Sequence, residues 1–108
     1  MIEVTYYRDL NRLTIRGHAK SDEYGRDLIC AACSTLALTM SANVAYMNAA
    51  DCIEDPVTIL EEGNAEISCK AKEQFQDSVK QVFMSVCVGF EILATEYPNY
   101  ISYRVCGW

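Results

Sequence analysis

The sequence is short of histidine, of proline and of basic side chains. It has one histidine and two prolines, and nine Lys and Arg against fifteen Asp and Glu give its 108 residues a net charge of −6. The sequence has no cluster of basic residues that could bind along a phosphate backbone, so we do not expect nucleic acid as a direct ligand. One histidine without a second C-x-x-C pair also lacks the ligand set of most structural zinc sites. We therefore expect neither a metal nor another cofactor.

The N-terminus lacks the features of an export signal. The first residues, MIEVTYYRDL, have no basic start followed by an apolar core, and no stretch reaches the roughly 20 apolar residues of a membrane span. We therefore expect a cytoplasmic protein that does not enter a membrane. In that compartment the six cysteines are expected to be reduced, most of them packing as small apolar side chains.

The first half of the chain predicts a hairpin and a long helix. Segments 2–8 and 12–18 are rich in β-branched and aromatic residues and flank a polar Asp-Leu-Asn. From Asp27 to about Ala49 there is no Gly or Pro, and apolar residues recur at spacings of three and four, which is typical of a buried helix. Asp27 is a good residue for the N-cap of this helix.

The second half repeats the order of elements without repeating the sequence. Segments 57–62 and 65–71 flank Gly63-Asn64, a strong hairpin signal. An apolar stripe from about 73 to 97 predicts a second helix that ends before Pro98, and residues 100–106 predict a last strand. The order β-β-α-β-β-α-β predicts one α+β domain over residues 1–108. Its antiparallel sheet, two hairpins plus a C-terminal strand, packs on two long helices. An apolar helix face that the sheet does not cover could be buried against a second copy of the chain. The sheet and the two helices could equally bury all of their apolar faces against each other.

The chemistry of the chain is concentrated in residues 17–34, GHAKSDEYGRDLICAACS. Cys30 falls near the predicted helix start, where unpaired N–H groups and the helix dipole favour thiolate over thiol. His18, at the end of the second predicted strand, can be held beside that helix start and exchange a proton with the sulfur. Such a pair suffices for acyl transfer through a thioester.

Other residues of this segment can have either a structural or a functional role. Asp27 can cap the helix or orient His18, and Ser34 can hydrogen-bond within the site or simply allow close helix packing. Tyr24, an aromatic residue in the connecting loop, can contact a substrate or pack. Cys30 and Cys33 also form a C-A-A-C pair, but the βαβ context of thioredoxin-like redox motifs is missing, so we expect Cys33 to pack in the core.

The segment resembles the signature of the ribosomal-processing cysteine proteases, the Prp family. The matching string is Gly17-His18-Ala19, five residues, Gly25, one residue, Asp27, two apolar residues, Cys30-Ala31-Ala32, one residue, and Ser34. The step of twelve residues from histidine to cysteine agrees, and the resemblance extends more loosely over the whole chain. Cys33 is a departure, since it is not part of the family signature.

The resemblance implies a bacterial, cytoplasmic, homodimeric endopeptidase. Its substrate would be the N-terminal extension of large-subunit ribosomal protein number twenty-seven, cut after an aromatic pair. Carried over by position, Cys30 is the nucleophile, His18 is the general base and acid, and Asp27 and Ser34 support the site. Gly17 and Gly25 match the glycines that bound a mobile loop.

Two other classes of function remain open at this stage. In a non-enzymatic, dimeric, ribosome-associated binding module, Cys30 would only pack in the core. In a thiol-redox protein, Cys30 and Cys33 would form a reversible disulfide.

Overall fold

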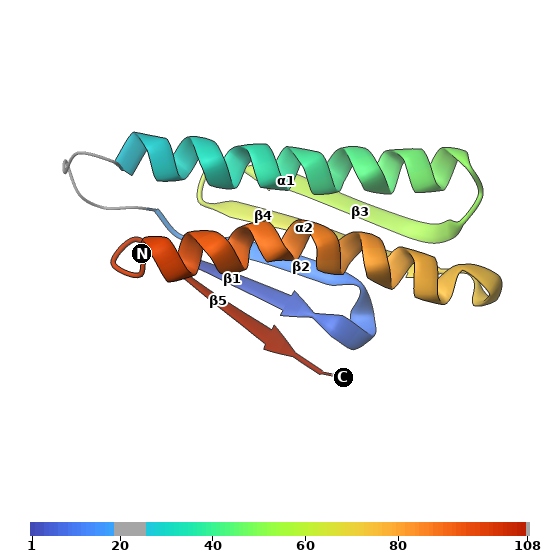
Figure 1. Ribbon diagram of the computed structural model, residues 1–108. Coiled ribbons are helices and arrows are strands. Elements are labelled where there is room, and N and C mark those ends of the chain that lie inside the picture. Colours follow the sequence, from blue (N-terminus) through green and yellow to red (C-terminus); the bar gives the residue numbers. More distant parts are fainter. Residues whose placement is uncertain (19–25, 108) are drawn as a thin grey trace.

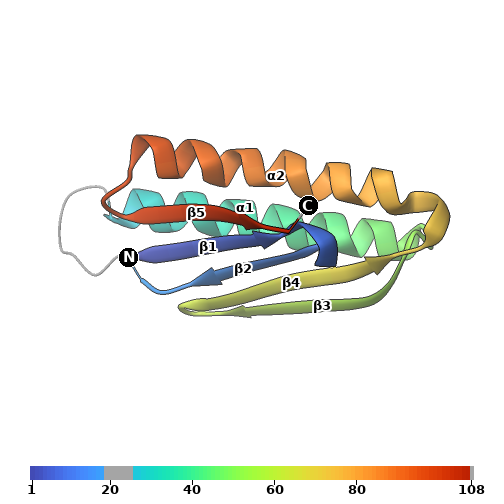
Figure 2. The same ribbon diagram turned by 90° about the horizontal axis from the view of Figure 1, so that it is seen from below.

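The computed structural model describes residues 1–18 and 26–107 and consists of one mixed sheet with two helices on one face. The strand order is β3-β4-β2-β1-β5. In chain order the elements are β1 (Ile2–Tyr7), η1 (Arg8–Leu10), β2 (Arg12–Arg16), α1 (Arg26–Ala49), β3 (Ile53–Glu61), β4 (Asn64–Ala71), η2 (Glu73–Phe75), α2 (Gln76–Glu96) and β5 (Ile101–Cys106). Figures 1 and 2 show α1 and α2 lying side by side across the sheet.

The predicted fold class is confirmed, with one difference in strand direction. The strands β1, β2, β4 and β3 pair antiparallel in that order, but β5 pairs parallel with β1. The reason is the connection through α2, because a helical crossover returns the chain to the end of the sheet from which β4 started. Strand β5 therefore runs in the same direction as β4 and β1.

Strand β3 is longer than the sequence predicts. The sequence predicts this strand over residues 57–62, but β3 begins at Ile53 and contains Pro56. The strand lies at the edge of the sheet, and its register with β4 shifts between Glu54 and Val57. Asp55 adopts a left-handed conformation with φ 51° at this bulge. Proline is tolerated there because an edge strand at a bulge has no ladder bond for it to donate.

The core lies between the sheet and the inner faces of the two helices. Strand β1 contributes Tyr6, which is 2% exposed and stacks on the fully buried Phe83 of α2 with ring centroids 6.1 Å apart. Helix α1 contributes side chains at the three- and four-residue spacing that predicted it. These buried residues of α1 are Ile29, Cys33, Ala37, Met40 and Val44.

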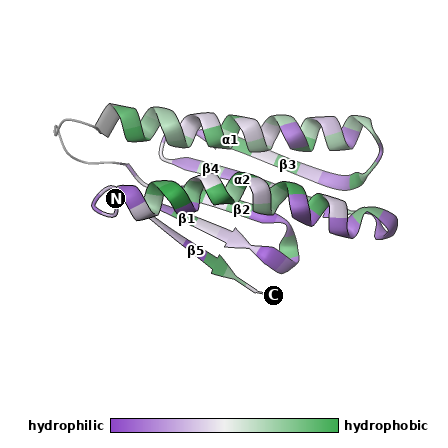
Figure 3. Cartoon of the chain, viewed as in Figure 1, coloured by the Kyte–Doolittle hydropathy of each residue, from purple (hydrophilic) through white to green (hydrophobic). Residues whose placement is uncertain are grey.

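Both helices also carry apolar residues on their outer faces. Leu38 and Tyr46 of α1 and Val88 and Ile92 of α2 are each more than half exposed, and Figure 3 shows apolar residues distributed around both helices. By length and composition alone, Leu28–Ala49 and Glu73–Glu96 are apolar enough to cross a membrane. The expectation that no stretch of the sequence is that apolar was therefore wrong. The same composition is found in core helices, and each of these helices buries one face on the sheet.

The packing of Phe83 gives a direct test of this core. We expect Phe83→Ala to lower the free energy of unfolding by about 3–5 kcal/mol, because it removes a buried ring and leaves a cavity. Leu10→Ala is the control, since Leu10 is 58% exposed and its truncation should change stability by less than about 0.5 kcal/mol. Urea titration followed by circular dichroism measures both. Equal effects of the two substitutions would contradict the packing described.

Candidate active site

Helix α1 presents Cys30 to the space above the sheet, close to the beginning of the helix. The helix begins at Arg26, one residue before the predicted N-cap, so Asp27 lies within the first turn rather than before it. Cys30 is therefore one turn inside the helix, next to the buried Ile29 and half-buried itself. Because side chains on a helix lean toward its N-terminus, the sulfur is directed toward the first turn, where N–H groups have no partner within the helix.

His18 follows β2 and is fastened by backbone hydrogen bonds on both sides. The N–H of Gly17 donates to the carbonyl oxygen of Gly63 at 3.0 Å, and the N-terminal ammonium of Met1 donates to the carbonyl oxygen of His18 at 2.8 Å. Gly17 has φ +95°, and a Cβ there would lie 2.4 Å from the carbonyl oxygen of Met1. Only glycine fits this position, so the chain reaches His18 on a defined path.

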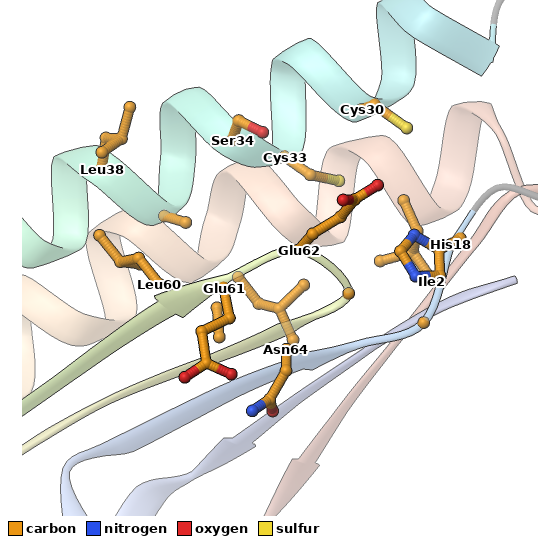
Figure 4. Close-up of a pocket in the computed structure, with 15 residues that line it drawn as sticks. Ile2, His18, Cys30, Cys33, Ser34, Leu38, Leu60, Glu61, Glu62 and Asn64 are labelled. Carbon is orange, nitrogen blue, oxygen red and sulfur yellow. The ribbon is translucent and has the colours of Figure 1, made fainter.

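The two residues line one cavity of about 450 Å³ between α1 and the β3–β4 hairpin. Figure 4 shows the sulfur of Cys30 on the helix wall and the imidazole of His18 on the opposite wall. Gly17 and Ser34 line the same cavity. The structure therefore brings together five of the residues that the sequence singled out, Gly17 and His18 after β2 and Cys30, Cys33 and Ser34 of α1.

The remaining predicted residues cannot be placed in the site. Tyr24 and Gly25 lie outside the described residues, as does the side chain of Asp27. Their roles stay predictions.

The sequence did not reveal that the β3–β4 hairpin forms the wall facing α1. Leu60, Glu62 and Gly63 line the cavity, with Leu38 contributed by α1. Figure 4 shows the carboxylate of Glu62 directed toward α1 and His18, whereas Glu61 and Asn64 point away from the helix. The Gly63-Asn64 signal predicted the turn one residue too late, since β4 already begins at Asn64. No local signal indicated that this turn would lie beside His18.

The six cysteines, all within the described residues, are free thiols with different environments. Burial, with a smaller electrostatic contribution from Cys30, raises the pKa of Cys33 to about 11. Burial likewise raises the pKa of Cys69 and of Cys87 to about 11. Cys33 is therefore a protonated thiol at neutral pH, which matches the packing role predicted for it and disfavours a redox pair with Cys30.

One protein family matches nearly the whole chain, including every residue that lines the cavity. Residues 1–102 match the family model described as cysteine protease Prp. The chain belongs to the cysteine protease Prp family. It is a cysteine protease, and the resemblance that the segment 17–34 suggested is confirmed.

Several solved structures share this fold. SMU.848 from Streptococcus mutans is 25% identical with a TM-score of 0.70, and the match covers 98% of this chain and 94% of that one. The essential ribosomal processing protease Prp from S. aureus, in complex with a covalently linked product peptide, is 18% identical with a TM-score of 0.66. The same S. aureus protease in complex with a substrate peptide has a TM-score of 0.61 at 18% identity. In both of these matches 96% of each chain is covered. No curated protein sequence matches the chain significantly.

Alkylation distinguishes the half-buried Cys30 from the buried Cys33, although both line the cavity. We expect iodoacetamide at pH 7.5 to modify Cys30 well before Cys33, because the thiolate fraction of a thiol with a pKa of about 11 is very small at that pH. The labelling rate of Cys33 should rise about tenfold per pH unit below its pKa. Peptide mass mapping over time measures both, with Cys30→Ser as the control. Equal rates for Cys30 and Cys33 at pH 7.5 would contradict the two environments.

Proposed function

We propose that this protein is an endopeptidase in which Cys30 is the nucleophile and His18 is the general base and acid. The single observation that carries this is their placement on facing walls of one cavity, with the sulfur close to a helix N-terminus. The sulfur attacks the scissile carbonyl carbon and His18 takes its proton. The imidazolium then protonates the leaving amine, and the thioester that remains is hydrolysed by a water molecule that His18 activates.

The polar support of this reaction comes from α1. The N–H groups of its first turn, which have no partner within the helix, are the donors suited to a developing oxyanion. Ser34 is one turn deeper than Cys30 and lines the cavity, so its hydroxyl is placed to bind the substrate or the reacting groups. Asp27 is proposed to orient the imidazole, and Tyr24 to contact the substrate. Gly17 and Gly25 are proposed to bound the segment between His18 and the helix.

The cavity favours an extended peptide with an apolar side chain. Beyond Ser34 it is lined by Leu38 of α1 and Leu60 of β3, which are 59% and 44% exposed. Covering the exposed apolar side chains on both walls of a groove with an apolar group of the ligand removes apolar surface from water, which favours binding. The substrate we propose is the N-terminal extension of large-subunit ribosomal protein number twenty-seven, cleaved in the bacterial cytoplasm. Family membership and the fold shared with a ribosomal processing protease support this choice.

Mass spectrometry of the extended ribosomal protein tests the proposed nucleophile. Wild-type protein should release a short N-terminal peptide, and Cys30→Ala should release none, because burial raises the pKa of Cys33, the other cysteine that lines the cavity, to about 11 and keeps its thiol protonated. The matched control is Cys52→Ala, another half-buried cysteine that does not line the cavity, and it should cleave like the wild type. Cleavage by Cys30→Ala at the wild-type rate would refute the role of Cys30.

The role of His18 has its own measurement. We expect His18→Ala to lower the rate of cleavage by at least about 10²-fold, the usual contribution of a positioned general base. Circular dichroism should show an unchanged fold, since the imidazole is exposed. Wild-type cleavage rates in His18→Ala would remove His18 from the mechanism.

We further propose that the protein is a homodimer formed through the outer faces of the helices. The support is the apolar surface there, with Val88 and Ile92 of α2 exposed by 52% and 56%. Val88→Glu should convert a dimer to a monomer in sedimentation equilibrium, because it puts a charge in the apolar contact. The control is Val105→Glu, a similarly exposed valine, 48% exposed, on strand β5. A wild-type protein that sediments as a monomer at micromolar concentration would contradict the proposal.

A further inference from the structure

The turn between β3 and β4 lies directly against the imidazole of His18. Gly63, in that turn, has φ +71°, and a Cβ built on it would lie 2.4 Å from His18 Nε2 and 2.7 Å from Cε1. Real Cβ atoms do not approach other heavy atoms closer than about 3.0 Å. The ring of His18 therefore occupies the space that any side chain at position 63 would need.

This contact is part of a wider connection between the turn and the end of β2. Residues Arg16 and Asn64 are paired in the β2–β4 ladder, and beyond that pair the N–H of Gly17 donates to the carbonyl oxygen of Gly63 at 3.0 Å. The backbone on both sides of the contact is thus held by hydrogen bonds. The imidazole is exposed, and its close approach to Gly63 limits how far the ring can move toward the turn.

We propose that Gly63 is a positioning residue for His18. Because Gly63 has no side chain, the imidazole can lie against the β3–β4 turn, where it faces Cys30 across the cavity. A side chain at position 63 would push the ring out of this place. The inference rests on the proposed function, in that it assigns importance to the position of His18 because His18 transfers the proton.

Glycine at position 63 meets two separate requirements. The left-handed backbone conformation disfavours most residues, and the space next to the imidazole excludes a Cβ. Asparagine separates them, because it tolerates the left-handed conformation better than other non-glycine residues but still carries a Cβ. Gly63→Asn should therefore fold and still displace the imidazole.

Kinetics of two variants test the proposal on the extended ribosomal protein. We expect Gly63→Asn to lower kcat by about 10²-fold with little change in KM, since a displacement of about 1 Å in a reacting group costs about that much. Asn64→Ala is the control, because Asn64 is the next residue and lines the same cavity, but its side chain points away from the helix. It should keep kcat within about threefold of the wild type. A wild-type kcat in Gly63→Asn would overturn the proposal.

The single histidine of the chain supplies a readout that a merely structural role would not move. The ring proton resonances of His18 should shift in Gly63→Asn and stay in place in Asn64→Ala. In the wild-type protein we expect a nuclear Overhauser effect between the Cε1 proton of His18 and a Cα proton of Gly63. This last measurement needs no variant to fold, and its absence would refute the contact on which the proposal rests.

The outcomes also distinguish a failure of this inference from a failure of the proposed function on which it rests. If Cys30→Ala and His18→Ala cleave like the wild type, the proposed function fails. If both are inactive while Gly63→Asn has the wild-type kcat and unshifted His18 resonances, the proposed function stands and the role of Gly63 is refuted.

Discussion

The structure depends on the burial of the inner face of α1 against the sheet. Ile29, Cys33, Met40 and Val44 are each no more than 5% exposed, and together they fix both the position and the rotation of the helix. Cys30 lies beside this row, between Ile29 and Cys33. Once the row is buried, the sulfur of Cys30 must lie at the border of the core, facing the β3–β4 hairpin. The apolar packing therefore places the proposed nucleophile without any polar contact of its own.

The other wall of the cavity is built by strand pairing. Because β4 lies between β2 and β3, the turn that joins β3 to β4 comes next to the end of β2. The Gly17–Gly63 hydrogen bond extends this pairing past the ladder, and His18 follows immediately. Two glycines thus bring the backbones together, one by its own close approach to Met1 and one by leaving room for the imidazole. The site consists of a helix positioned by its apolar face and a histidine positioned by the sheet.

Local patterns predicted most of the elements, because the signals of helices and hairpins lie within a few residues. The spacing of apolar residues located both helices, and the polar breaks located both hairpins. The two largest differences, both in the strands, depended on distant partners. Pro56 lies inside β3 because the strand is at an edge, and β5 is parallel to β1 because α2 carries the chain across the sheet. The start of α1 differed by one residue, where capping signals are weakest.

The sequence by itself determined the reactive groups of this protein. The segment from Gly17 to Ser34 contains the histidine, the cysteine and the small residues of a cysteine protease signature, and their chemistry is a property of residue type and local spacing. The tertiary structure alone decided what faces them. Leu60, Glu62 and Gly63 are far from this segment in the chain, and no periodicity or motif marks them as part of a site. They reach it because the pairing of β2 with β4 and the packing of α1 bring distant segments together, and such contacts depend on the whole fold.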